Sequence, residues 1–140
     1  MERLIGRPVV AGTAEGIAMV AQQPLSFWGG LDPATGEVID PRHHLSGNMV
    51  AGRVLVMPFS RGSSTTSSVL LELIRGKKAP AAIVTSGVDP MLALGSIVAA
   101  ELYGRSIPVV ALEEEQYSRI REGDRVVVHP DGAVEVKAHE

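Results

Sequence analysis

Three short apolar runs that alternate with two helix-like segments are the feature that most constrains the fold. The runs Arg53–Pro58, Ala81–Thr85 and Ile107–Leu112 are dominated by valine, isoleucine and other aliphatic residues, which is typical of buried strands. Between them, helices are predicted from about Thr66 to Arg75 and from Met91 to Leu102. The order strand, helix, strand, helix, strand predicts parallel strands packed between layers.

Shorter β-type segments flank this centre on both sides. Residues Arg7–Gln22 read as two short strands interrupted at Gly12 and Gly16, and a hairpin is predicted around Pro130-Asp131-Gly132. Asp89 stands where the second helix needs its N-cap, directly before a proline. We therefore expect one α/β domain over residues 1–140, with central parallel strands and antiparallel β-rich flanks.

Composition excludes several classes of protein and site. The 140 residues carry a formal net charge of −3, which does not favour binding to nucleic acid or to an anionic membrane. The chain has no cysteine, so it can form neither a disulfide nor a thiolate metal site by itself. No apolar run approaches the roughly 18 residues of a membrane span, and the first residues lack the pattern of a signal peptide, so we expect a cytoplasmic location.

Six consecutive hydroxyl residues stand at the first strand-to-helix turn, in the sequence RGSSTTSS that spans Arg61–Ser68. A helix N-terminus presents unpaired N–H groups and a partial positive charge, and Gly62 lets a ligand approach the backbone. Such a turn could bind an anion or stabilise a serine alkoxide that acts as a base. Helix capping is the simpler explanation of one or two hydroxyls, and the stretch matches neither a Walker phosphate loop nor a GxSxG elbow.

Several spaced motifs together resemble the small subunit, or swivel domain, of the aconitase X family. They are SFWGGLDPATGEVID, RGSSTTSSVLLELI, APAAIV and ALGSIVAAELYGRSIPVV, in this order along the chain. The resemblance extends over about residues 12–136. It implies a swivelling β/β/α domain like the C-terminal domain of aconitase, and a hydro-lyase shared with a larger, cysteine-bearing subunit.

The resemblance also implies roles for particular residues. Ser63 corresponds to the catalytic serine, which removes a proton next to a carboxylate, while Arg61, Gly62 and Ser64 shape the environment of its oxyanion. This chain would bind no cofactor. An iron–sulfur cluster or iron is expected in the large subunit, where it accepts the departing hydroxyl group as a Lewis acid.

Two substrates are known for the family, and the sequence favours one of them. Trp28 in SFWGG, the run SSTTSS and the segment ELYG resemble the branch that dehydrates cis-3-hydroxy-L-proline to pyrroline-2-carboxylate. The alternative is mevalonate 5-phosphate, in an isoprenoid route. A phosphate group would benefit from more cationic residues near the site than Arg61 and Arg42. Two other classes stay open, a stand-alone module that binds small anions and a purely structural assembly domain.

Two further segments carry both a functional and a structural interpretation. The motif Ser26-Phe27-Trp28-Gly29-Gly30 could be a flap over the substrate, a contact with the large subunit or a local core plug. The active-site side is favoured, because the motif belongs to the signature of the family that the chain resembles. His43 and His44 could be metal ligands or acid–base groups, but adjacent residues point in different directions, so bracing of the loop is favoured. The chain departs from the family pattern at these histidines, and at Ser60, where glycine is common.

Overall fold

The three apolar runs form the parallel centre of a mixed sheet. In residues 1–60 and 65–138, which the computed structural model describes, eight strands follow the order β1-β8-β7-β3-β4-β5-β6-β2. The parallel strands are β3 (Ala14–Val20), β4 (Val54–Met57), β5 (Ala82–Ser86) and β6 (Val109–Leu112). The prediction of central parallel strands is therefore confirmed.

Antiparallel strands extend the sheet on both sides, as predicted. β7 pairs with β3 and with β8, β8 pairs with β1, and β2 pairs with β6. Their bounds are Glu2–Ile5 for β1, Arg7–Val10 for β2, Arg125–Val128 for β7 and Ala133–Lys137 for β8. Two details differ from the sequence prediction. β1 was not predicted, and Gly16 lies inside β3, where a Cβ atom would approach the carbonyl oxygen of Gly52 to 2.8 Å.

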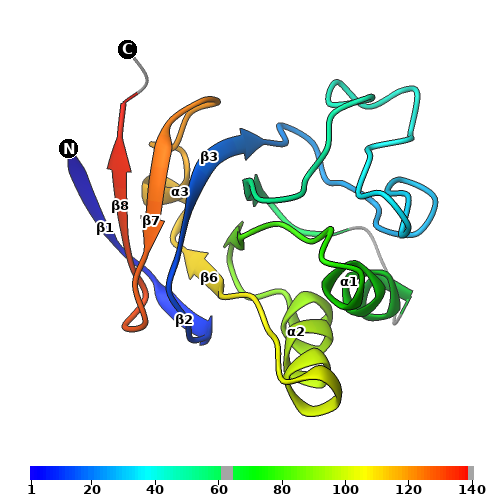
Figure 1. The fold of residues 1–140 in the computed structure, drawn as a ribbon. Coiled ribbons are helices and arrows are strands. Elements are labelled where there is room, and N and C mark those ends of the chain that lie inside the picture. The colour runs from blue at the N-terminus through cyan, green and yellow to red at the C-terminus, as the bar shows by residue number, and fades with distance from the viewer. Residues whose placement is uncertain (61–64, 139–140) are drawn as a thin grey trace.

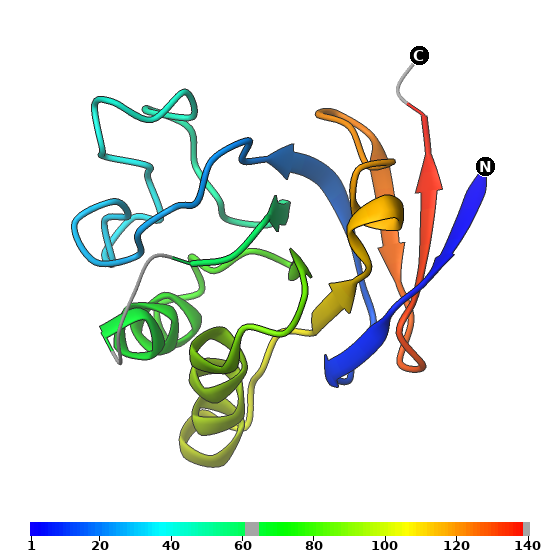
Figure 2. The same cartoon turned by 180° about the vertical axis from the view of Figure 1, so that it is seen from behind.

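The two ends of the sheet are joined by one residue. β1 and β2 stand at opposite ends of the strand order, yet only Gly6 separates them, so the sheet must curl back on itself (Figures 1 and 2). At this point the N–H of Gly6 donates to the carbonyl of Gly132, at 2.9 Å. A Cβ atom at Gly6 would lie 2.6 Å from a methyl group of Val110, so a side chain there would block the closure.

Two helices cover one face of the parallel strands and pack against each other (Figure 1). They are α1 (Thr65–Arg75) and α2 (Pro90–Tyr103), and a short α3 (Glu114–Tyr117) follows β6. The predicted N-cap of α2 at Asp89 is confirmed, and Gly104 ends the helix with a φ of 66°. Among the described residues, no helix is long and apolar enough to cross a membrane.

The parallel strands separate two apolar cores because their side chains alternate between the two faces. In β4, Val54 and Val56 belong to the core enclosed by the curled sheet, whereas Leu55 and Met57 belong to the core under the helices. The long segment between β3 and β4 adds its own buried residues to the second core. These are Ala21, Leu25, Phe27, Leu31, Val38, Leu45 and Val50.

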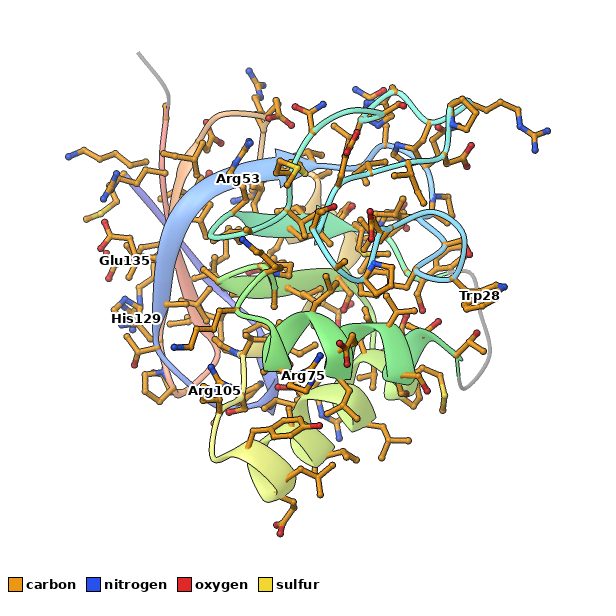
Figure 3. The ribbon with its side chains drawn as sticks, turned by 45° about the vertical axis from the view of Figure 1, so that its right-hand side comes forward. Trp28, Arg53, Arg75, Arg105, His129 and Glu135 are labelled. Atoms are coloured by element: carbon orange, nitrogen blue, oxygen red, sulfur yellow. The ribbon has the colours of Figure 1, made fainter. Side chains whose placement is uncertain are left out.

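Arg53 supports the strand that both halves of the sheet share. β3 pairs with β7 through its first residues and with β4 through its last. Where the pairing changes, the Arg53 guanidinium donates to the carbonyls of Ile17 and Ala18, at 3.1 and 3.0 Å, and contacts Glu122 at 3.1 Å (Figure 3). The side chain therefore satisfies carbonyl groups at the junction.

We predict that Gly132→Ala destabilises the fold more than Gly47→Ala. Both glycines have a φ of 90°, but a Cβ atom at Gly47 meets nothing within 4 Å, whereas one at Gly132 would overlap the carbonyl of Gly6. Gly47→Ala should lower the free energy of unfolding by about 1–2 kcal/mol, and Gly132→Ala by roughly 1–3 kcal/mol more. Urea denaturation measures both, and equal losses would contradict the steric argument.

Candidate active site

The ends of three parallel strands meet at one edge of the sheet, and the hydroxyl turn directly follows the first of them. The N–H of Ser86 at the end of β5 donates to the carbonyl of Pro58, at 3.2 Å, and the N–H of Gly87 donates to the carbonyl of Leu112, at 3.1 Å. In parallel α/β sheets, ligands bind at the carboxyl ends of the strands. The sequence therefore places the turn where a site is expected.

The predicted catalytic serine lies outside the described residues. Ser63, and with it Arg61, Gly62 and Ser64, belongs to the segment 61–64, so their roles stay predictions. Both flanks of the segment are described. Ser60 forms a parallel bridge with Leu25, and α1 begins at Thr65.

Asp89 connects the first flank to the second helix. Its side chain is only 7% exposed, and its two oxygens accept four hydrogen bonds. Oδ1 accepts from the N–H groups of Met91 and Leu92, at 3.2 and 3.3 Å. Oδ2 accepts from the N–H of Ser60 at 2.8 Å and from its hydroxyl at 2.7 Å. Sequence analysis predicted the cap but missed the bond to Ser60.

The first turn of α1 carries no acidic residue, so no carboxylate there offsets the partial positive charge of the helix N-terminus. Its hydroxyls differ in their surroundings. Ser67 donates to the carbonyl of Met91 at 2.6 Å, so it contacts α2 rather than solvent or the backbone of its own helix. Thr66 is buried, and its hydroxyl has no hydrogen-bond partner among the residues that the structure describes, whereas Ser68 is exposed.

The SFWGG motif forms a tight turn that buries one aromatic residue and exposes the next. Phe27 is fully buried in the core under the helices, a position that is typical of a core residue. Trp28 is 70% exposed and projects from the molecule near the start of α1 (Figure 3). Ser26 donates to the carbonyl of Trp28 at 2.8 Å, Gly29 has a φ of 78°, and a Cβ atom at Gly30 would overlap the carbonyl of Ser26. The role of the motif as a flap or interface stays a prediction.

The adjacent histidines brace the loop, as the sequence favoured. Nδ1 of His43 accepts from the N–H of Leu45 at 3.1 Å, and Nε2 of His44 accepts from the N–H of Gln22 at 3.0 Å. The two rings stack with their centroids 4.7 Å apart. Each ring therefore uses one nitrogen as an acceptor for the backbone.

A groove that sequence analysis missed lies along the same sheet edge. It has a volume of about 470 Å³ and is lined by residues 5–7, 86–88 and 111–114. Its charged side chains are Arg7, Glu113 and Glu114. Val88 joins the groove to Asp89, and thereby to the hydroxyl turn.

The residues of this chain do not fit a metal centre. The sequence contains no cysteine, and the described residues contain no group of three His, Asp or Glu side chains that could hold a metal ion.

The fold is that of an α/β domain with a curled mixed sheet. In the sequence, a run of hydroxyl residues follows the first of the three central strands β4, β5 and β6. The sequence profile of the aconitase X swivel domain matches residues 3–136, and the chain belongs to this family. The crystal structure of Thermococcus kodakaraensis aconitase X in its holo-form is similar, with a TM-score of 0.87 and 36% identity. The match covers 99% of this chain and 100% of that chain. The predicted family and fold class are confirmed.

Relatives of two kinds match the chain. The cis-3-hydroxy-L-proline dehydratase of Pseudomonas aeruginosa is 47% identical over an alignment of 142 positions, which covers 96% of this chain but 24% of that protein. The phosphomevalonate dehydratase small subunit of Thermococcus onnurineus is 40% identical over 136 residues, which are 96% of this chain and 98% of that subunit. The chain thus spans about a quarter of the first relative and nearly all of the second.

We predict that His44 titrates below the usual histidine pKa of about 6.5. Desolvation lowers its pKa most, the neighbouring His43 lowers it further, and Glu122 opposes both. The folded protein therefore favours the neutral ring, so this contribution to stability is present above pH of about 6.5 and is lost as the pH falls toward the folded pKa. Imidazole NMR titration measures the pKa. A value at or above that of a free histidine would contradict the prediction, and His44→Gln should remove this pH dependence.

Proposed function

We propose that this chain is the swivel component of an aconitase X-type hydro-lyase, and that Ser63 is the base that abstracts a proton from the substrate. The position of the hydroxyl turn carries the proposal. The turn begins where β4 ends and leads into a helix whose first turn has no acidic side chain. Membership of the aconitase X family supports the same role for the turn.

The proposed reaction removes water from a small hydroxy acid. The C–H bond next to the carboxylate breaks, its proton passes to the Ser63 oxygen, and the electron pair forms a carbon–carbon double bond. The neighbouring C–O bond breaks, and the hydroxyl group leaves as water after it takes up a proton. For cis-3-hydroxy-L-proline, the enamine product becomes pyrroline-2-carboxylate when a proton moves from nitrogen to carbon.

Ser63 needs a stabilised oxyanion to act as a base, because a hydroxyl group is a weak base in water. The partial positive charge at the start of α1 favours the alkoxide. Arg61 and the amides of Gly62 and Ser64 are the groups that we assign to this environment. The first turn of α1 carries no acidic side chain that would repel the alkoxide.

A larger, cysteine-bearing partner completes the proposed enzyme and supplies the iron or iron–sulfur centre. Two apolar side chains beside the site support docking there. Phe59 is 53% exposed and precedes Ser60, and Val88 is 47% exposed and precedes Asp89. Trp28, on the exposed side of its turn, is a further candidate contact. Large exposed apolar residues grouped around a site are typical of interfaces.

The preferred substrate is cis-3-hydroxy-L-proline, and mevalonate 5-phosphate is the alternative. The groove beside the turn carries one arginine and two glutamates, which does not favour a phosphate group. Identity to the hydroxyproline dehydratase, 47%, also exceeds that to the phosphomevalonate subunit, 40%. The 98% coverage of that subunit supports the alternative.

Replacing the proposed base should abolish turnover without preventing assembly. We expect Ser63→Ala to lower kcat of the complete enzyme by about 10²–10⁴-fold, since a general base contributes that much. Ser68→Ala is the matched control, because it belongs to the same run of hydroxyl residues and is exposed on α1. The assay uses both candidate substrates. Comparable turnover by Ser63→Ala would refute the assigned base.

Binding by the isolated chain separates the enzyme from an anion-binding module. Calorimetry of the isolated chain with inorganic phosphate and with L-proline, a small carboxylate, should detect no tight binding if the binding site forms only with the partner. Tight binding of either anion without the partner would favour the stand-alone module instead.

A charge placed beside the turn should weaken docking. We expect Phe59→Asp to weaken binding of the large subunit at least about tenfold, because a buried unpaired carboxylate is costly at an interface. Leu102→Asp is the control, since Leu102 is also exposed but lies near the far end of α2. Calorimetric titration of the two chains measures the affinity. Equal effects of the two substitutions would contradict docking at this edge.

A further inference from the structure

Asp89 does more than a helix cap requires. One side-chain oxygen suffices for the N–H groups of Met91 and Leu92, and serine, threonine or asparagine would provide it. The second oxygen accepts both donors of Ser60. We propose that Ser60 and Asp89 form a positioning pair, which fixes where the hydroxyl turn begins. This inference rests on the proposed function of the turn, because a positioning pair requires a reacting group to position.

The burial of Asp89 supports this role. A carboxylate that is 7% exposed is costly unless it is well hydrogen-bonded, and here four donors surround it. Bonds from donors to a carboxylate are stronger than bonds between neutral groups. The pair is therefore a rigid connection, in contrast to an exposed turn carboxylate such as Asp131, which accepts from the N–H of Ala133 and lies 3.9 Å from the Arg3 guanidinium.

Both flanks of the turn are held by the same short segment. Ser60 donates to Asp89 just before residues 61–64, and Ser67 donates to the carbonyl of Met91 shortly after them. Asp89 and Met91 are two residues apart at the start of α2. The start of α2 thus serves as a common support for the entry and the exit of the turn.

The support is itself fixed to the sheet. The hydroxyl of the buried Thr85 donates to the carbonyl of Gly87 at 2.6 Å, which holds the link between β5 and Asp89. Further along α2, the buried hydroxyl of Ser96 donates to the carbonyl of Ile107 at 2.6 Å and accepts from its N–H at 2.9 Å. The turn therefore takes its position from β5 and from the segment that leads into β6.

The test uses variants that separate positioning from capping. Asp89→Ser keeps an N-cap oxygen but removes the second acceptor, and Ser60→Ala removes only the hydroxyl donor. Both should lower kcat of the complete enzyme about tenfold or more with KM within about twofold, because a small displacement of a catalytic group has effects of this size. Ser60→Thr should retain activity, and Asp131→Asn is the control.

A double substitution tests whether the two residues act together. Asp89→Ser combined with Ser60→Ala should lower kcat little more than Asp89→Ser alone, since both remove the same interaction. If the decreases in log kcat of the two single variants add up in the double variant, the two residues act separately. If kcat is unchanged in both single variants, Asp89 acts only as a helix cap. Either result would overturn the proposal.

Amide hydrogen exchange gives a readout that does not depend on catalysis. In the chain alone, the N–H of Ser60 should exchange about tenfold faster in Asp89→Ser, while the N–H groups of Met91 and Leu92 stay within about threefold of wild type. Absence of turnover with either substrate in the wild-type enzyme would refute the proposed function, and the exchange rates would still decide this inference. An unchanged rate at Ser60 would overturn it.

Discussion

The contact between Gly6 and Gly132 is the constraint on which the rest of the structure depends. The two outermost strands of the sheet are consecutive in the chain, so the sheet can form only if it curls back and the chain crosses at this point. The crossing leaves no room for a side chain at either glycine. Once the sheet is curled, valines enclose one core on its inner face, and the outer face of the parallel strands is left for the helices.

The carboxyl ends of the parallel strands stay accessible. At the ends of β5 and β6, residues 86–88 and 111–114 line an open groove of about 470 Å³. Backbone hydrogen bonds between these strand ends, such as the one from the N–H of Ser86 to the carbonyl of Pro58, keep the ends at a fixed spacing. Residues far apart in the sequence, among them Ser60 and Asp89, are thereby brought together.

Sequence reasoning succeeded where the pattern is local and failed where two distant segments meet. The strand around Val54–Met57, the helix from Thr65 and the cap at Asp89 follow from apolar runs and capping residues that neighbour one another. β1 escaped prediction because only Leu4 of its four residues is buried, which gives no alternation to detect. The bond from Ser67 to α2 has no sequence signal, since a hydroxyl in a first turn is expected to cap its own helix.

Helix capping alone does not explain the number of hydroxyls around the turn. Ser60 binds Asp89 and Ser67 binds α2, so these two hydroxyls hold the flanks in place. Thr66 buries a hydroxyl that has no hydrogen-bond partner among the described residues, and such a group disfavours the folded state by about 1–3 kcal/mol. Fixed flanks on both sides of residues 61–64 go beyond what capping requires, because a cap needs only one side-chain oxygen at the start of its own helix.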